Sequence, residues 1–213
     1  MRRLAARSAA LGPWCLPLLL GVACTALAFA AAGDARWHRL LDYRRAAIGT
    51  GDGWRLVTGH LMHWSNRHAA LDIGALALVA WIFETTLGPR RQVVVCVATV
   101  VVVDAALWTL HPSLDRYVGL SGLLHGWFAA GAVVWAAGGD PAERRWGAAL
   151  LAGLAGKLAL ESNGAAFWHV ASDFPVVTDA HRWGAAAGLA CGVVFAALSR
   201  RTGGDAAAAS RAR

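Results

Sequence analysis

Long apolar segments alternate with short clusters of charged residues along this chain. Six of them reach or approach the roughly 17 to 25 residues that a helix needs to cross a hydrocarbon core about 30 Å thick. They are Trp14–Ala32, His68–Leu87, Val93–Leu110, Ser121–Ala137, Trp146–Leu160 and Ala180–Leu198. The pattern predicts an all-α membrane protein with six transmembrane helices. The fifth segment is short and holds Lys157 and Glu161, so it can span only if these two groups face protein or water.

Composition supports a chain whose main solvent is lipid. Of its 213 residues 57% are hydrophobic and only 15% are charged, whereas a soluble domain needs a charged surface. We expect residues 1–200 to form a single integral membrane domain and the Ala-, Gly- and Arg-rich residues 201–213 to form a disordered cytoplasmic tail. The net charge of +7 is explained by arginines near anionic headgroups, so it indicates the lipid bilayer as a partner and no nucleic acid.

Arginine placement gives the expected orientation, because basic residues favour the cytoplasmic side of a membrane. Eleven arginines lie before the first segment, in the second and fourth connections, and after the sixth segment, against eight on the other side. This modest excess predicts that both termini are cytoplasmic. The basic stretch Met1–Ser8 before an apolar run also fits a cleaved signal, but Trp14–Ala32 is long enough to span and is read here as a retained helix.

This orientation puts three polar residues on one side of the membrane. The second, fourth and sixth segments then all begin at the outer face, and they carry His68, Ser121 and His181 at their starts. A catalytic constellation requires such a shared side and depth. The convergence favours a functional site.

Small residues line two of these segments at every fourth position: Ala180, Gly184, Gly188, Gly192 and Ala196 in the sixth, and Gly122, Gly126 and Ala130 in the fourth. Such faces let helix backbones approach closely in lipid. His181 shares the face of Gly184 and Gly188, so it would meet Ser121 if the two faces meet. Spacing alone favours this arrangement no more than general glycine packing with a polar residue at each helix end.

A family resemblance adds to this reading. Gly119-Leu120-Ser121-Gly122, Ala180-His181 with Gly184 and Gly188, and Trp54-Arg55 leading through His63 to His68 together resemble the rhomboid intramembrane serine proteases. The resemblance covers about Trp54 to Leu198 and implies a rhomboid-like helical bundle. The longer string Gly119–Gly126, with Lys157 and Glu161, resembles the rhombosortase branch more narrowly. That branch is linked to bacterial proteins with a C-terminal Gly-Gly sorting signal, an apolar helix and a basic tail.

The resemblance implies a Ser–His dyad that works without a carboxylate. Ser121 would attack the scissile carbonyl, and His181 would take its proton and later return it to the leaving amine. The oxyanion would be bound by the backbone N–H of Ser121, by His68 and by the residue four positions beyond it, with Gly119 and Gly122 beside them.

The residue four positions beyond His68 is Asp72, where rhomboids usually carry asparagine. An ionised aspartate would repel an oxyanion. Either apolar surroundings keep Asp72 protonated, or it orients His68 from behind and donates nothing, which is the interpretation we favour because the two lie one helical turn apart.

Other polar residues near the predicted site have more than one interpretation. His63 is expected to support the first loop, and His125 to line the substrate cavity or to be a satisfied buried histidine. Lys157 and Glu161 are expected to form an internal ion pair with a structural role, or alternatively to contact the substrate's tail.

The histidines raise a rival metal hypothesis. They are His60, His63, His68, His125, His169 and His181. His60-Leu61-Met62-His63 is not the HExxH helix of a zinc protease, so neither a metal nor a cofactor is predicted.

The predicted function is therefore intramembrane serine proteolysis of transmembrane anchors in single-span client proteins with C-terminal Gly-Gly tails. The expected location is a bacterial inner membrane, with the site opening to the periplasm. Two alternatives come from other classes. A catalytically silent relative would bind clients without cutting them, but Ser121 and His181 are both present. A small polytopic transporter would be expected to show an inverted repeat, and none is visible.

Overall fold

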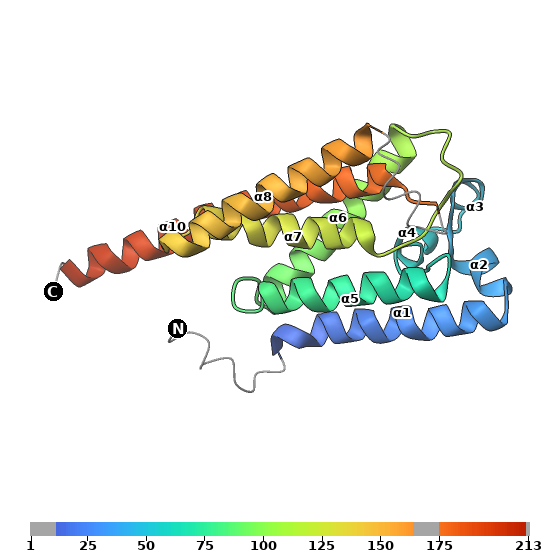
Figure 1. The fold of residues 1–213 in the computed structure, drawn as a ribbon, viewed down its shortest axis with the longest axis horizontal. Helices are drawn as coiled ribbons and strands as arrows, with labels where there is room; N and C mark the ends of the chain where they lie inside the picture. The colour runs from blue at the N-terminus through green and yellow to red at the C-terminus, as the bar shows by residue number, and fades with distance from the viewer. Residues whose placement is uncertain (1–11, 164–174, 212–213) are drawn as a thin grey trace.

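The chain is built almost wholly of helices. The computed structural model describes residues 12–163 and 175–211, with side chains described to residue 200. A short 3-10 turn, η2 (Gly12–Trp14), leads into the first of the long helices, which are α1 (Cys15–Gly33), α5 (Asn66–Ile82), α6 (Pro89–Thr109), α7 (Ser121–Ala136), α8 (Pro141–Ser162) and α10 (Thr178–Arg211). Successive long helices reverse direction, so α1 begins and α10 ends at the same end of the bundle (Figure 1). The opposite end, where α5, α7 and α10 begin, is called the Ser121 end.

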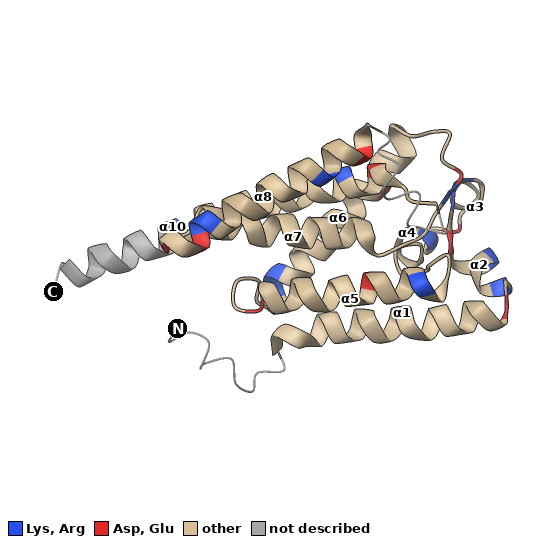
Figure 2. Ribbon diagram, viewed as in Figure 1, with Lys and Arg blue, Asp and Glu red and all other residues tan. Residues whose placement is uncertain are grey.

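Three stretches among the described residues are long and apolar enough to cross a membrane: Gly12–Gly33, Pro89–Thr109 and Thr178–Arg200. Lys, Arg, Asp and Glu gather mostly toward the two ends of the bundle, and long middle stretches of the helices carry few of them (Figure 2). A band with few charges between two charged ends suits a lipid environment. The count of six spans and the cytoplasmic termini stay predictions.

Polar first turns explain why some helices begin earlier than the apolar segments suggest. The Asp140 side chain accepts hydrogen bonds from the N–H groups of Ala142 and Glu143, an N-cap that starts α8 five residues before the predicted Trp146. α5 is likewise capped by Ser65, which accepts from the N–H of His68 at 3.2 Å. Apolar length alone misses such ends because a cap is made of polar residues.

The C-terminal helix is also longer than its apolar segment. α10 continues past the expected end at Leu198 to Arg211, through a stretch rich in alanine, the strongest helix former. The predicted division into a domain at 1–200 and a disordered tail at 201–213 stays a prediction.

α7 lies in the middle of the bundle, packed between α10, α8 and α6. Its Trp127 is fully buried. The glycine face of α10 meets α7 so closely that a Cβ on Gly184 or Gly188 would lie nearer than 3.0 Å to the backbone of Gly122 or Gly126. Backbone contact of this kind replaces the hydrophobic burial that drives helix association in water.

Gly188→Ala is expected to lower the stability of the fold by about 1 to 3 kcal/mol, because the new methyl group would force α7 and α10 apart. Thermal unfolding in detergent would measure the change. Gly156→Ala is a matched control, since Gly156 on α8 has no atom within 4 Å of its would-be Cβ. Equal unfolding temperatures for the two variants would contradict the close packing of α7 and α10.

The segment between α1 and α5, called the α1–α5 connection, is folded and lies at the Ser121 end. It contains α2 (Arg36–Leu41), β1 (Tyr43–Arg44), α3 (Arg45–Gly49) and α4 (Arg55–Thr58). Buried Arg55 holds it together by donating to the carboxylate of Asp52 and to the carbonyl oxygens of Asp42 and Arg39. β1 pairs antiparallel with β2 (Arg116–Tyr117), placing Tyr43 opposite Tyr117. This two-stranded ribbon, which was not predicted from the sequence, joins the α1–α5 connection to the chain just before Ser121.

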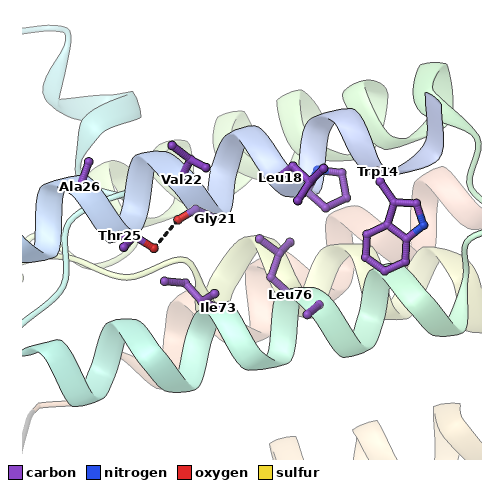
Figure 3. Close-up of a pocket in the computed structure, with 10 residues that line it drawn as sticks. Trp14, Leu18, Gly21, Val22, Thr25, Ala26, Ile73 and Leu76 are labelled. Carbon is purple, nitrogen blue, oxygen red and sulfur yellow. Dashed lines mark hydrogen bonds between the residues drawn. The ribbon is translucent and has the colours of Figure 1, made fainter. Parts of the chain in front are cut away.

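A groove of about 440 Å³ runs between α1 and α5 (Figure 3). Its described lining carries no ionisable group. The hydroxyl of Thr25 is already used within its own helix, donating to the carbonyl of Gly21 at 2.7 Å. The groove therefore offers apolar contact and no chemistry.

Candidate active site

A cavity of about 710 Å³ opens at the Ser121 end, between α5, α7 and α8. Polar side chains from the ends of four helices face it. Its remaining wall is largely apolar, with Leu78, Val79, Phe128, Leu150 and Leu154 among the lining residues. Few polar groups in a mostly apolar cavity are typical of a ligand or substrate site.

Ser121 and His181 meet at this cavity. Ser121 is the first residue of α7 and His181 lies in the first turn of α10. The Oγ atom of Ser121 is 2.9 Å from Nε2 of His181, a hydrogen-bonding distance. The glycine contact between α7 and α10 is what holds the two helix starts at the same level. Of the two arrangements that the spacing left open, the structure has the one that joins these residues.

A carboxylate faces the other nitrogen of the same imidazole. Both carboxylate oxygens of Glu161 lie 3.1 Å from Nδ1 of His181. The family resemblance implies a dyad without a carboxylate, whereas the structure has a carboxylate at this nitrogen. The reason lies in the tertiary structure. The i,i+4 spacing on α8 relates Glu161 only to Lys157, and the folding of α8 back beside α10 brings it to His181.

Lys157 and His125 complete a cluster around the imidazole. Nζ of Lys157 lies 2.5 Å from Oε1 of Glu161 and 2.9 Å from Nε2 of His125. An ammonium can only donate, so Nε2 of His125 accepts and its Nδ1–H donates to the carbonyl of Ser121 at 2.6 Å. The rings of His125 and His181 are stacked, with centroids 4.1 Å apart and an interplanar angle of 12°. The predicted ion pair is present, and His125 both lines the cavity and covers one face of the imidazole.

The same cluster is the one group of described residues that offers three metal-ligand atoms close together. Atoms of His125, Glu161 and His181 lie within 4.8 Å of one another. However, the ammonium of Lys157 already donates to two of these three residues. A metal ion would have to displace this cation, so the arrangement favours a hydrogen-bonded cluster. His169 of the metal hypothesis lies outside the described residues.

The loop before Ser121 requires glycine at position 119. Gly119 has φ +133°, and a Cβ there would lie 3.1 Å from Cε1 of His68. This conformation is strained for other residues. The buried hydroxyl of Tyr117 donates to the carbonyl of Gly119 at 2.7 Å, and burial raises the pKa of Tyr117 well above its usual range, which keeps this donor protonated. Gly122 packs against the carbonyl of Ala180 and the hydroxyl of Tyr117. Tyr117 was not predicted as a site residue, and its only signal in the sequence is its place four residues before Ser121.

Asp72 holds this loop more directly than it holds His68. Its Oδ2 accepts from the N–H of Leu120 at 2.9 Å and lies 3.2 Å from Nε2 of His63. The corresponding distance to Nε2 of His68 is 3.6 Å, beyond a normal hydrogen bond. His63 therefore supports the site through Asp72. Asp72 therefore has a role that the sequence did not indicate, fixing the residue before Ser121, and its orientation of His68 at the longer ion-pair distance stays a prediction.

Asp72→Ala is expected to destabilise the protein by about 1 to 3 kcal/mol, because it leaves the buried N–H of Leu120 and the ring of His63 without their acceptor. Asp72→Asn keeps an oxygen that can accept from Leu120 and should lose much less. Thermal unfolding of both variants in detergent tests this difference. A smaller loss for alanine than for asparagine would show that the contact with Leu120 contributes little.

Comparisons with known proteins address the identity of this arrangement. The family model of the Rhomboid domain matches residues 50–198, which include every residue of the cluster described above. Comparison with curated proteins gives no match. The family match and the span-like helices together indicate an integral membrane protein.

Proposed function

The chain belongs to the rhomboid family, whose members are generally intramembrane serine proteases, and on this premise we propose that it is an active endopeptidase of the rhombosortase kind. The observation that carries the proposal is the 2.9 Å contact between Oγ of Ser121 and Nε2 of His181 at the cavity. A hydroxyl within hydrogen-bond reach of an imidazole is what nucleophilic catalysis by serine requires.

In the proposed reaction, Oγ of Ser121 attacks the scissile carbonyl and Nε2 of His181 takes the hydroxyl proton. The imidazolium then gives this proton to the leaving amine, and the C–N bond breaks to leave an acyl-enzyme. Water, deprotonated by the same imidazole, releases the acyl group and regenerates Ser121. The N–H groups in the first turn of a helix lack intrahelical acceptors, which supports a role for the backbone of Ser121 in binding the oxyanion.

His68 is the second proposed oxyanion donor. Its Nδ1 lies 3.4 Å from the N–H of Trp64; if it accepts from this group, the ring proton is on Nε2. That nitrogen lies beside Gly119, because a Cβ on the glycine would be 3.2 Å from it. Asp72 is not proposed as a donor, because its carboxylate already accepts from Leu120.

The proposed substrates are single-span membrane proteins with C-terminal Gly-Gly tails. The string Gly119–Gly126 together with Lys157 and Glu161 supports this branch, and the apolar wall of the cavity suits a membrane anchor. We place the protein in a bacterial inner membrane with six spans and both termini cytoplasmic. The start of α1 and the end of α10 lie at the end of the bundle opposite Ser121 (Figure 1), which supports a site opening to the periplasm.

Labelling of membranes with a fluorophosphonate probe tests the proposed activity. The probe reacts with an activated serine, so we expect labelling of the wild type and none of Ser121→Ala. Equal labelling of the two proteins, or none of either, would contradict the protease function and favour a silent relative that binds clients.

Co-expression with reporter proteins tests the proposed substrate class. Each reporter carries a Gly-Gly tail, an apolar helix and a basic end, and the control replaces Gly-Gly by Val-Val. We expect mass spectrometry to find a new C-terminus near Gly-Gly in the first reporter alone, and it will also show any acceptor joined to that end. Equal cleavage of both reporters would contradict the rhombosortase assignment and leave the protease assignment intact.

A further inference from the structure

We propose that Glu161 is a positioning residue for His181, so that the reacting unit is Ser121–His181–Glu161 and not a dyad. This inference rests on the proposed protease function. It concerns a residue whose sequence context indicated only an ion pair with Lys157 or contact with the substrate.

Glu161 fixes the position of the imidazole proton. A carboxylate can only accept hydrogen bonds. With both oxygens of Glu161 at 3.1 Å from Nδ1, this nitrogen must carry hydrogen and donate it. The neutral ring then has its lone pair on Nε2, which faces Oγ of Ser121 at 2.9 Å. Only this tautomer can take the serine proton, because the other would point an N–H at Oγ.

Glu161 also stabilises the imidazolium that forms during the reaction. The side chains of His181 and Glu161 are only 6% and 4% exposed, so water does little to stabilise an imidazolium there. A carboxylate at Nδ1 provides that stabilisation when Nε2 gains the proton. Lys157 donates to Oε1 of the same carboxylate at 2.5 Å, and its positive charge offsets the penalty of keeping this negative charge buried.

The ring of His181 is held on three sides. Ser121 faces Nε2, Glu161 faces Nδ1, and the ring of His125 stacks on the face at 4.1 Å. His125 is itself fixed by Lys157 and by the carbonyl of Ser121. These four residues contact His181 or its partners from α7 and α8. Each contact restricts rotation of the imidazole, and in the described part of the chain Glu161 is the acceptor at Nδ1 that decides which nitrogen is protonated.

Glu161→Gln tests the proposal, because it keeps the size of the side chain and removes its charge. We expect kcat to fall by about 10²-fold or more, with KM changed by less than about threefold, because the carboxylate acts on the base and not on substrate binding. Glu161→Asp should recover at least about tenfold over the glutamine variant. Glu143→Gln is the matched control, since it makes the same change near the other end of α8, about 27 Å away.

The pH profile separates positioning from a merely structural role. Loss of the carboxylate disfavours the imidazolium, so the acid limb of the kcat/KM profile should move to lower pH in Glu161→Gln. Glu161→Gln also leaves Lys157 without its anion. The double variant Lys157→Gln/Glu161→Gln removes both charges of the pair, so it should keep the loss of kcat and show a smaller shift in the same direction, with a wild-type unfolding temperature.

Two outcomes would overturn the proposal. If Glu161→Gln or the double variant keeps kcat within about fivefold of the wild type with an unshifted profile, Glu161 is structural, although Ser121 still reacts with the fluorophosphonate. If wild-type Ser121 does not react with the probe at all, the proposed function fails and this inference fails with it.

Discussion

Ser121→Ala is expected to reduce peptide-bond cleavage by about 10⁴-fold or more while leaving the fold intact. The substitution removes the attacking oxygen but keeps the helix start, because alanine is the best helix former. Ser121 is half-buried at the cavity, so the loss of one hydroxyl there leaves little empty volume. Cleavage of a Gly-Gly reporter in reconstituted vesicles, followed by mass spectrometry, measures the rate.

Ser199→Ala is the matched control, since it makes the same change near the opposite end of the bundle, where Ser199 bonds to Arg91. We expect the control to cleave at the wild-type rate. A Ser121→Ala variant that cleaves within tenfold of the wild type would remove Ser121 from the reaction. The nucleophile would then have to be another side chain of the cavity.

His181→Ala is expected to show a loss of the same order, about 10⁴-fold, with unchanged membrane insertion. Ser121 keeps its hydroxyl but has no base at 2.9 Å to take the proton. The double variant Ser121→Ala/His181→Ala should be no slower than either single variant, because residues that act as one unit give non-additive losses. Cleavage rates of the three variants, compared as a double-mutant cycle, measure this.

His38→Ala is a suitable control for the histidine change. His38 lies on α2, bonds to Asp42 at 3.0 Å and is not among the described residues that line the cavity. Independent losses that multiply in the double variant would mean that Ser121 and His181 do not act on the same proton.

Much of the fold follows from the order of residues in the chain. Apolar length located the long helices, because a helix that meets lipid must be apolar over most of its length. The glycines at 184 and 188 indicated a close contact in the same way, since only small residues allow it. Capped starts such as Asp140 were missed, because a polar cap is invisible to a search for apolar length. The β1–β2 ribbon was missed because it consists of two residues in each strand, too few to show an alternating pattern.

The residues of the site fall into the same two groups: those that local sequence patterns indicate, and those that only helix packing brings together. Ser121, His181 and Gly119 are marked by local motifs, so the sequence by itself indicated a hydroxyl and an imidazole at the starts of two helices. The partners of these groups are not local. Glu161 is twenty residues from His181, Asp72 forty-eight residues from Leu120, and Lys157 thirty-two residues from His125. Contacts over such separations depend on how α5, α8 and α10 pack against α7.

The chain's own order of residues therefore determined the membrane helices, their small-residue faces and the two groups proposed to react. Tertiary structure alone decided which side chain faces each nitrogen of His181 and which group holds the loop before Ser121. The physical reason is the range of each effect. Hydropathy and helix periodicity act over one or two turns, whereas a hydrogen-bond partner is chosen by the distance between helices that the chain connects only remotely.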